Sequence, residues 1–259
     1  ADAANRVGDL ADEISLGTSR VDSLAWLEDL NRAAAGLAQQ DAAWEPALEV
    51  PGFAWPGAAT QLLAVAQQDM AELLLRGDCE IGSRRVLFVT SSAPGAGATT
   101  VALCLARAAL GRGERVVLVD ADLTEPTLAA QLGICPQTSW TTALETDLPL
   151  GEALVESLQE RAILAPLAHP VARPEPLLAH PGLANFWQAL VNRFDRVIVD
   201  AGSLTRGSQV AGLIGLQVAE LLFVQDTRRP AAPELNQALR CFPNLQACRC
   251  GIVQNYVRS

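Results

Sequence analysis

The sequence predicts an α/β fold, in which a doubly wound, mainly parallel sheet is flanked by helices and preceded by an N-terminal helical extension. From residue 85 onward, short runs of Val, Ile and Leu alternate with stretches of helical spacing. The runs are apolar throughout, which is typical of strands buried on both faces of a parallel sheet. Half of the 259 residues are hydrophobic, so the chain can form the core of one large domain.

The expected elements follow one another in regular order. The strands are expected at 86–90, 115–120, 162–165, 196–200, 219–225 and 249–254. The helices between them are expected at 99–112, 126–132, 150–159, 182–193, 206–216 and 231–241. Another helix is expected at 60–76, before the first of these strands. Since such sheets bind ligands at the carboxyl ends of their strands, the loops that follow the strands are the candidate functional segments.

The N-terminal part is expected to differ from the rest: residues 1–57 as a helical extension and proline-rich linker, and residues 58–259 as the sheet domain. An apolar stripe from Val21 to Leu37 predicts the helix, which either packs on the domain or docks a protein partner. Residues 45–57 contain three prolines and two glycines, which predicts a linker or an irregular wrap.

The composition narrows the functional classes. The net charge of −10 disfavours broad nucleic-acid binding and adhesion to anionic lipid, because both need a basic surface. No apolar run reaches the roughly 18 residues of a membrane span. No secretory signal is visible, and the six cysteines lack a disulfide pattern, so we expect them to be packing residues. A cytoplasmic protein with no direct membrane span is expected.

The most informative segment is 91–100, Ser-Ser-Ala-Pro-Gly-Ala-Gly-Ala-Thr-Thr, which directly follows the first expected strand. A strand, a glycine-rich turn and then a helix form the setting of a nucleotide-binding P-loop. The residue after Gly97 should be the lysine that reaches the terminal phosphates, but it is Ala98. Lysine is absent from the whole chain, because all 19 residues counted as Lys or Arg are arginine.

Two acidic segments complete the pattern. Asp120-Ala-Asp-Leu-Thr-Glu-Pro follows the loop by about twenty residues, and Phe194-Asp-Arg-Val-Ile-Val-Asp comes much later. In this order, over roughly residues 60–257, the segments resemble the MinD/ParA-like superfamily of deviant P-loop NTPases. Within that superfamily they resemble the bacterial tyrosine kinases (BY-kinases) of exopolysaccharide assembly. The family's own segments are Ser-x-x-Pro-Gly-x-Gly-Lys-Ser/Thr, Asp-Ala-Asp-Leu-Arg-Arg-Pro and Tyr-Asp-x-Val-Ile-Ile-Asp.

The resemblance implies roles for individual positions. In an active member, loop amides hold the phosphates of ATP, a hydroxyl ligates Mg²⁺, and the acidic segments bind metal or activate the attacking hydroxyl. The implied cofactor-binding residues are Gly95, Gly97, Thr99 and Thr100. The implied metal positions are Thr99, Asp120 and Asp200. The implied catalytic positions, which we expect to be relics here, are Ala98, Asp120, Asp122 and Asp200.

The missing lysine is the departure with the largest energetic consequence. A unit charge about 3 Å from a phosphate oxygen contributes roughly 5 kcal/mol at an effective dielectric constant of about 20, before desolvation is subtracted. Even half of that corresponds to about two decades in affinity or rate. A further departure follows Asp200, where Ala-Gly-Ser replaces the family's usual Thr-Pro-Pro.

Three other departures concern charge and assembly. Thr124 and Glu125 stand where the family has a pair of arginines. The helix at 60–76 has Arg76 as its only arginine, whereas the family's oligomerising helix carries Glu-x-x-Arg-x-x-Arg. Tyr256 is the only tyrosine, so the family's tyrosine cluster is absent.

These departures predict a pseudo-enzyme: a catalytically inactive, BY-kinase-like P-loop protein that acts as a cytosolic scaffold or regulator of exopolysaccharide biosynthesis or export. We expect no cofactor, or at most weak binding of ATP or ADP with Mg²⁺. The expected partner is a protein of a polysaccharide-assembly or other membrane-associated complex, which would hold the chain at the periphery of the inner membrane. We expect no nucleic acid, and a monomer or a dimer that is not part of a ring.

Two alternatives from other functional classes stay open. The first is a weak ATPase or tyrosine kinase in which an arginine supplied in trans replaces the missing lysine. The second is a MinD/ParA-like positioning module that docks to a membrane or a secretion apparatus. Turnover of ATP would favour the first alternative, and association with lipid or DNA would favour the second.

Overall fold

The computed structural model describes residues 46–77, 86–204, 220–228 and 249–257 of the chain. The chain divides into two units, Ala1–Ala42 and Ala43–Ser259, and all described residues belong to the second. The expected N-terminal helix and the expected helices at 206–216 and 231–241 therefore lie outside the described residues.

The described strands form one eight-stranded sheet in the order β1-β4-β5-β3-β6-β2-β7-β8. Their bounds are β1 Leu48–Val50, β2 Val86–Ser91, β3 Val116–Asp120, β4 Val155–Ser157, β5 Ala162–Ala165, β6 Arg196–Ser203, β7 Glu220–Asp226 and β8 Arg249–Asn255. All neighbouring pairs are parallel except β4 and β5, which are antiparallel. All six predicted strands are confirmed, and so is the predicted fold class.

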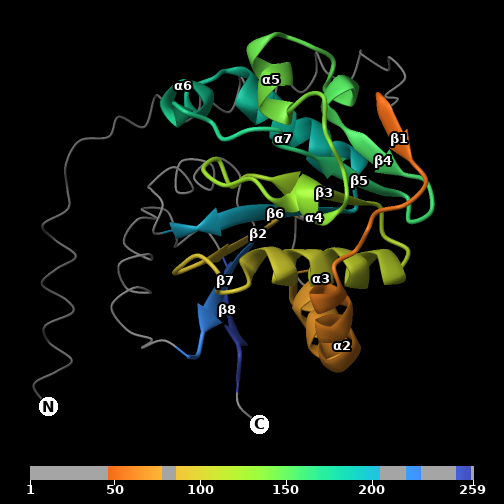
Figure 1. The fold of residues 1–259 in the computed structure, drawn as a ribbon, viewed down its shortest axis with the longest axis vertical. Coiled ribbons are helices and arrows are strands. Elements are labelled where there is room, and N and C mark those ends of the chain that lie inside the picture. Colours follow the sequence, from red (N-terminus) through yellow and green to blue (C-terminus); the bar gives the residue numbers. More distant parts are fainter. Residues whose placement is uncertain (1–45, 78–85, 205–219, 229–248, 258–259) are drawn as a thin grey trace, which may run out of the picture. The chain divides into compact units, whose positions relative to one another are not determined.

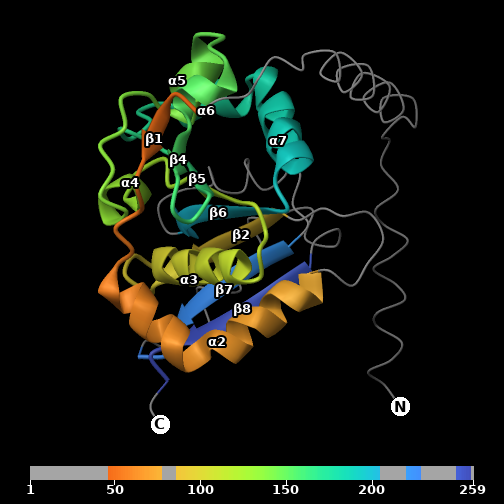
Figure 2. The same cartoon turned by 90° about the vertical axis from the view of Figure 1, so that its right-hand side faces the viewer.

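Helices cover both faces of the sheet, as the doubly wound prediction requires. Their bounds are α2 Gly57–Gly77, α3 Ala98–Gly111, α4 Leu128–Gln131, α5 Trp140–Glu145, the 3₁₀ helix η1 Leu150–Ala153, α6 Pro174–Leu178 and α7 Gly182–Arg193. Figures 1 and 2 show α2 and α3 on one side of the sheet and α5 and α7 on the other. The predicted helices at 60–76, 99–112, 126–132 and 182–193 are thus confirmed, the third in a shorter form.

The core is divided between the two faces of the sheet. In β2, Val86 and Phe88 belong to the cluster that includes α7, whereas Leu87 and Val89 belong to the cluster that includes α3. Both sets are buried, which explains why the strand is apolar at every position. The α7 side is rich in aromatic residues, with Trp140 stacked on a neighbouring ring at a centroid distance of 4.8 Å.

The predicted helix at 150–159 is wrong. The segment forms the short η1 turn and then β4, which pairs antiparallel with β5. Leucines at positions 150, 154 and 158 have helical spacing, but Leu154 is buried and Leu158 is exposed, so they do not share one buried face. The hairpin to β5 needs a left-handed residue, and Arg161 supplies it with φ of 57°.

The expected linker also contributes to the sheet. Within the described part of 45–57, β1 pairs in parallel with β4 at the sheet edge, and Phe53 is buried beside α2 and α3. Two prolines, Pro46 and Pro51, flank β1 closely, as is tolerated at the ends of a short edge strand. Residues 48–53 therefore belong to the sheet domain.

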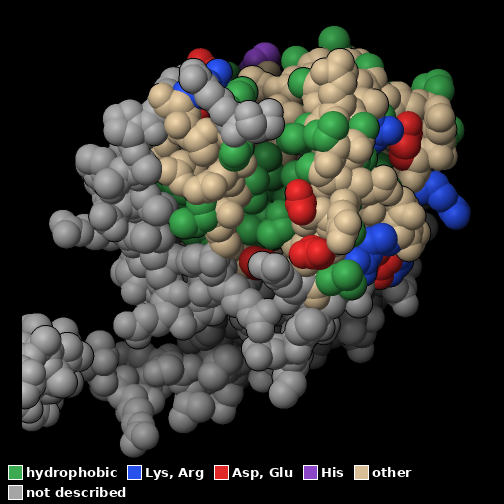
Figure 3. Space-filling view, turned by 90° about the horizontal axis from the view of Figure 1, so that it is seen from below, with side chains coloured by type: hydrophobic (Ala, Val, Ile, Leu, Met, Phe, Trp, Pro, Cys, Tyr) green, Lys and Arg blue, Asp and Glu red, His purple; other side chains and the backbone are tan. Residues whose placement is uncertain are grey.

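One face of the described residues can be examined for a basic patch in Figure 3. On the face shown in Figure 3, hydrophobic side chains lie together in a hollow with acidic side chains beside them. Among the residues drawn in colour, this face carries no continuous patch of arginine. Nucleic-acid binding depends on a basic surface, and for the surface as a whole its absence stays a prediction from the net charge.

Candidate functional site

The glycine-rich loop joins the buried strand β2 to the first turn of α3. Gly95 and Gly97 have φ of 77° and 101°, a left-handed conformation that favours glycine. Gly97 is the N-cap residue of α3, and no side chain caps the helix there. Because the first N–H groups of a helix have no partner within the helix, this end offers donors to an anion, as a P-loop requires.

Ala98 occupies the position of the missing lysine. The residue is 6% exposed and belongs to the core cluster that includes α3 and α2. The loop therefore presents backbone donors to a phosphate group, without a cationic side chain at this position.

Two buried carboxylates lie at the carboxyl ends of neighbouring strands. Asp120 ends β3 and stands directly opposite Asp200 of β6. Burial, followed by the charge of Asp200, raises the pKa of the Asp120 carboxyl well above its usual value. Burial also raises the pKa of the Asp200 carboxyl to about 6, against the lowering effect of a hydrogen bond from Thr99. The structure thus brings together all three implied metal positions, Asp120, Asp200 and the Thr99 hydroxyl at the start of α3.

Backbone and indole groups hold this end of β3 in place. The Asp120 carboxylate accepts hydrogen bonds from the N–H of Leu128 at 3.0 Å and from the N–H of Asp122 at 3.3 Å. The indole of Trp140 donates to the carbonyl of Asp120 at 2.8 Å. These hydrogen bonds fix the position of the Asp120 side chain and of the strand end that carries it.

Asp122 has a different local environment. Its carboxylate accepts hydrogen bonds from the hydroxyl of Thr124 at 2.7 Å and from the N–H of Glu125 at 2.9 Å. The residues that replace the family's two arginines therefore serve a turn around Asp122. Gly202 approaches this carboxylate so closely that a Cβ there would lie 2.2 Å from Oδ2, which accounts for glycine where the family has proline.

The end of β8 contacts the glycine-rich loop. The side-chain amide of Asn255 donates to the carbonyl of Ala96 at 2.9 Å, and the hydroxyl of Tyr256 donates to the carbonyl of Gly95 at 3.4 Å. A Cβ at Gly97 would lie 2.3 Å from the Asn255 amide nitrogen, so this glycine also makes room for the contact.

Arg228 lies beside this contact and is already paired. Its guanidinium lies 3.4 Å from the centre of the Tyr256 ring. It also donates two hydrogen bonds, of 2.9 Å and 2.8 Å, to the carboxylate of Asp226, whose side chain is 2% exposed. Asp226 thus neutralises the Arg228 cation, which lies against the tyrosine that contacts the loop.

The predicted site is thus assembled in part by residues that the sequence did not single out for it. The sequence identified Gly95, Gly97, Asp120 and Asp200, but not Asn255. The signal for Asn255 was its place at the carboxyl end of the last predicted strand, where sheets of this class bind their ligands. Among the described residues, no group of three or more His, Cys, Asp or Glu side chains is arranged to hold a metal ion. A metal at this site would therefore depend on ligands such as the Thr99 hydroxyl and phosphate oxygens.

The chain shares sequence with a much longer protein. Over 175 residues it is 27% identical to the succinoglycan biosynthesis transport protein ExoP of Rhizobium meliloti (strain 1021). The match covers 66% of this chain and 22% of that protein, so the chain spans about a fifth of the length of its curated relative. No protein-family model matches the chain.

Solved structures share its fold. The chimerical protein CapA2B2 has a TM-score of 0.68 at 18% identity, covering 82% of this chain and 96% of its own. The kinase domain of the Escherichia coli tyrosine kinase ETK has a TM-score of 0.65 at 19% identity, covering 71% and 72%. The septum site-determining protein MinD of Pyrococcus horikoshii OT3, complexed with Mg-ADP, has a TM-score of 0.54 at 22% identity, covering 68% and 72%. These likenesses confirm the predicted P-loop NTPase-like fold. Among the helices of the described segments, none has both the length and the apolar character that a membrane span needs.

Proposed function

We propose that the chain, which shares the fold of a bacterial tyrosine kinase domain, is catalytically inactive. It would act as a scaffold or regulator in exopolysaccharide biosynthesis or export. The observation that carries the proposal is Ala98, whose methyl group is buried in the core at the position of the phosphate-binding lysine. The likeness to ExoP, a succinoglycan biosynthesis transport protein, supports the pathway.

The electrostatics of the site support inactivity. Phosphoryl transfer depends on cations that neutralise the charge developing on the transferred group. Here Asp120, Asp122 and Asp200 gather around the loop, while Arg228 is neutralised by a buried carboxylate. An ATP molecule bound to the loop would meet backbone donors and several acids, with little positive charge to offset its own.

Weak nucleotide binding is compatible with this role. The fold neighbour MinD is complexed with Mg-ADP. In this chain the Thr99 hydroxyl, Asp200 and the loop amides keep the arrangement that could hold a magnesium nucleotide weakly. We propose that ATP or ADP with Mg²⁺ binds at millimolar concentrations at best, and that no turnover follows.

The proposed partner is a protein of a polysaccharide-assembly or other membrane-associated complex. Such a partner would hold the chain at the cytoplasmic side of the inner membrane without a span of its own. Helix α2 lacks the paired arginines of the family's oligomerising helix, so we propose a monomer or a dimer that is not part of a ring.

The deciding experiment separates a scaffold from an enzyme in cells. Deletion of the gene should reduce exopolysaccharide output, and the Asp120→Asn and Asp200→Asn variants should restore it as well as the original chain does. A variant that disrupts the core, Leu190→Asp, serves as the control that fails to restore output. Restoration by the original chain alone would overturn the proposed inactivity, and unchanged output after deletion would overturn the pathway.

A second candidate is a weak ATPase or kinase that an arginine supplied in trans completes. The retained hydrogen bond between Thr99 and Asp200 favours it, because an inactive site has no catalytic reason to keep that pair. Phosphate release that appears only when a candidate partner is added, and that disappears in Asp120→Asn, would favour this candidate over the scaffold.

A further inference from the structure

The two edge strands of the sheet, β1 and β8, differ in how they are protected against further pairing. Strand β1 has three residues, carries the exposed Glu49 at its centre and is flanked by Pro46 and Pro51. A short strand, a charge and a nearby proline are usual means of blocking an edge. Strand β8 has seven residues, contains no proline and carries its only charged residue, Arg249, at its first position. In the part of the chain that the structure describes, no strand lies on the outer side of β8, so this edge is much less protected than that of β1.

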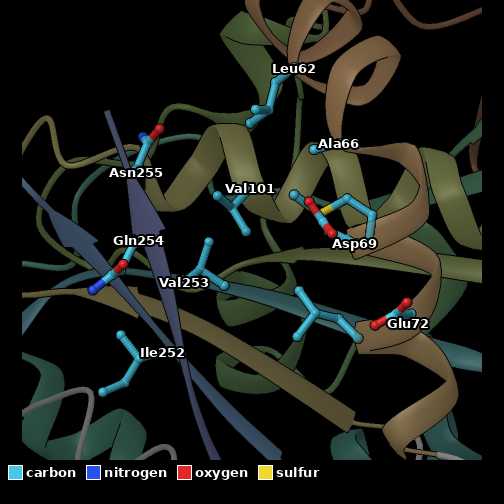
Figure 4. A pocket seen from close by; sticks show the side chains of 11 residues that line it. Leu62, Ala66, Asp69, Glu72, Val101, Ile252, Val253, Gln254 and Asn255 are labelled. Carbon is cyan, nitrogen blue, oxygen red and sulfur yellow. The ribbon is translucent and has the colours of Figure 1, made fainter. Parts of the chain in front are cut away.

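Exposed apolar side chains gather on α2 and β8. Seven large apolar side chains are exposed among the described residues, and five of them lie on α2, on β8 or just after β8. They are Val65, Leu75, Ile252, Tyr256 and Val257. A groove of about 300 Å³ lies between the two elements, and Figure 4 shows Leu62 and Ala66 of α2 across it from residues 252–255 of β8. Apolar surface that gathers in one region is typical of a protein–protein contact.

The sequence of β8 is self-complementary for antiparallel pairing. With Ile252 on a twofold axis, it stands opposite Ile252 of a second copy, and Val253 stands opposite Gly251. The Ile252 side chain, which is 54% exposed in one copy, is then covered by its counterpart. Arg249 stands opposite Asn255, at the other end of the paired strands from the second Arg249. Like charges on the two strands therefore do not face each other directly.

Pairing through β8 gives a closed assembly. The described part of the chain offers one long edge without a central charge, so this pairing joins two copies and then stops. Twofold dimers of this kind are the commonest homo-oligomers. Because the axis is normal to the joined sheet, both α2 helices lie on the same face of it.

We propose that two copies of this chain form a dimer through β8, whose edge pairs antiparallel with the same strand of the second copy around Ile252. The two eight-stranded sheets then form one continuous sheet. The inference deepens the proposed function, on which it rests for its biological meaning, because it names the surface of a dimer that is not part of a ring.

Sedimentation equilibrium of the full chain tests the association. The particle mass should rise from that of one chain to that of two between about 1 and about 500 μM, with a Kd below about 100 μM. Because each copy carries a net charge of −10, added salt should tighten the dimer, by about threefold between about 50 and about 500 mM. A mass of one chain at every concentration, or a mass that grows beyond two chains, overturns the proposal.

Matched variants test the location. Ile252→Arg places two guanidinium groups opposite each other across the axis and should weaken the dimer about tenfold or more. Leu158→Arg is the control, because Leu158 is also 54% exposed but follows β4, away from the β8 edge. It should change the Kd by less than about twofold. A dimer that Ile252→Arg leaves intact, or that both variants weaken equally, overturns the assigned surface.

Cross-linking tests the register. In Ile252→Cys the two introduced side chains lie opposite each other, with Cβ atoms about 5 Å apart, within reach of a short bismaleimide. This variant should give at least about fivefold more cross-linked dimer than Leu158→Cys or the original chain, whose six cysteines set the background. Equal yields from the three chains overturn the pairing around Ile252.

Hydrogen exchange tests strand pairing itself. The outward amides of β8 should exchange more slowly at about 500 μM than at about 5 μM, because the second strand supplies them with acceptors. The amides of β1 should exchange alike at both concentrations. Protection of β8 that is independent of concentration would mean that the chain itself covers this edge, which overturns the proposal. None of these measurements involves ATP or polysaccharide, so a chain that stays monomeric refutes the dimer and leaves the scaffold role to its own test.

Discussion

The side-chain amide of Asn255 donates a hydrogen bond of 2.9 Å to the carbonyl of Ala96, across the space that the missing side chain of Gly97 leaves open. The contact joins the last strand of the sheet to the P-loop through the folded chain itself. A side chain of the last strand therefore holds the loop directly.

Removing this contact should loosen the loop. We expect Asn255→Ala to lower the free energy of unfolding by about 1 kcal/mol, the typical loss for one hydrogen bond of a partly buried pair. Gln254→Ala, on the same strand and exposed, should change it by less than about 0.5 kcal/mol. Denaturant unfolding measures both variants. An equal effect of the two would mean that the bond to Ala96 does not stabilise the loop.

Restoring the missing charge should restore some affinity for nucleotide. We expect Ala98→Lys to bind Mg-ATP about tenfold or more tightly than the original chain, because the loop glycines keep their conformation. Since Ala98 is buried, the longer side chain should also cost about 1–3 kcal/mol of stability. Ala98→Met has similar bulk without charge and is the matched control.

Thermal unfolding with and without Mg-ATP measures the gain as a shift in Tm. The shift should appear in Ala98→Lys and be absent, or much smaller, in Ala98→Met. Equal shifts in both variants would show that packing, not charge, limits binding. A clear shift of the original chain at tens of micromolar ATP would contradict the proposed loss of affinity.

The sequence predicted the central strands because they are buried on both faces and therefore apolar throughout. It did not predict β1 or β4, because each has three residues and so gives too short a pattern. The leucines at 150, 154 and 158 imitated a helix, whereas tertiary pairing with β5 decided the structure. Local propensity is a weak guide where a segment lies at the edge of a sheet.

The site, like the fold, could be predicted from the sequence only in part. Gly95 and Gly97 could be predicted, because a tight turn between strand and helix needs glycine at fixed positions. The sequence also placed Asp120 and Asp200 each at the end of a strand, but their position opposite one another depends on the strand order, which puts β3 beside β6. Asn255 could be placed at the carboxyl end of a strand, but its contact with the loop could not be predicted, because the contact depends on a strand order that puts β8 two strands from β2.

The two buried carboxylates should make stability depend on pH. The pKa of Asp200 is about 6 in the folded chain against an ordinary value of 3.8, so the fold favours the protonated form. Its contribution to stability is therefore full below about pH 4 and is lost as the pH rises through about 6. Asp120 acts in the same direction, since burial raises its pKa as well.

Asp200→Asn should consequently stabilise the chain at about pH 8, by up to about 3 kcal/mol, and change little at about pH 4. The gain is an upper value, because the amide must still accept the hydrogen bonds from Thr99 and from the N–H of Gly202. Denaturant unfolding at both pH values measures the difference. Glu145→Gln, exposed on α5, should show no such dependence. A loss of stability in Asp200→Asn at the higher pH would show that the ionised carboxylate is bound favourably, as a retained cation site would require.

The sole tyrosine should not become phosphorylated by the chain itself. The hydroxyl of Tyr256 donates to the carbonyl of Gly95, and Arg228 stacks on its ring, so the side chain is engaged outside the loop. With Ala98 in place of the lysine, we expect no phosphotyrosine after incubation with Mg-ATP, as measured by mass spectrometry. The Asp120→Asn variant separates the possible sources of any modification. Phosphate on Tyr256 in the original chain that is absent from this variant would identify the chain as an active kinase and contradict the proposed function, whereas phosphate on both would come from another kinase.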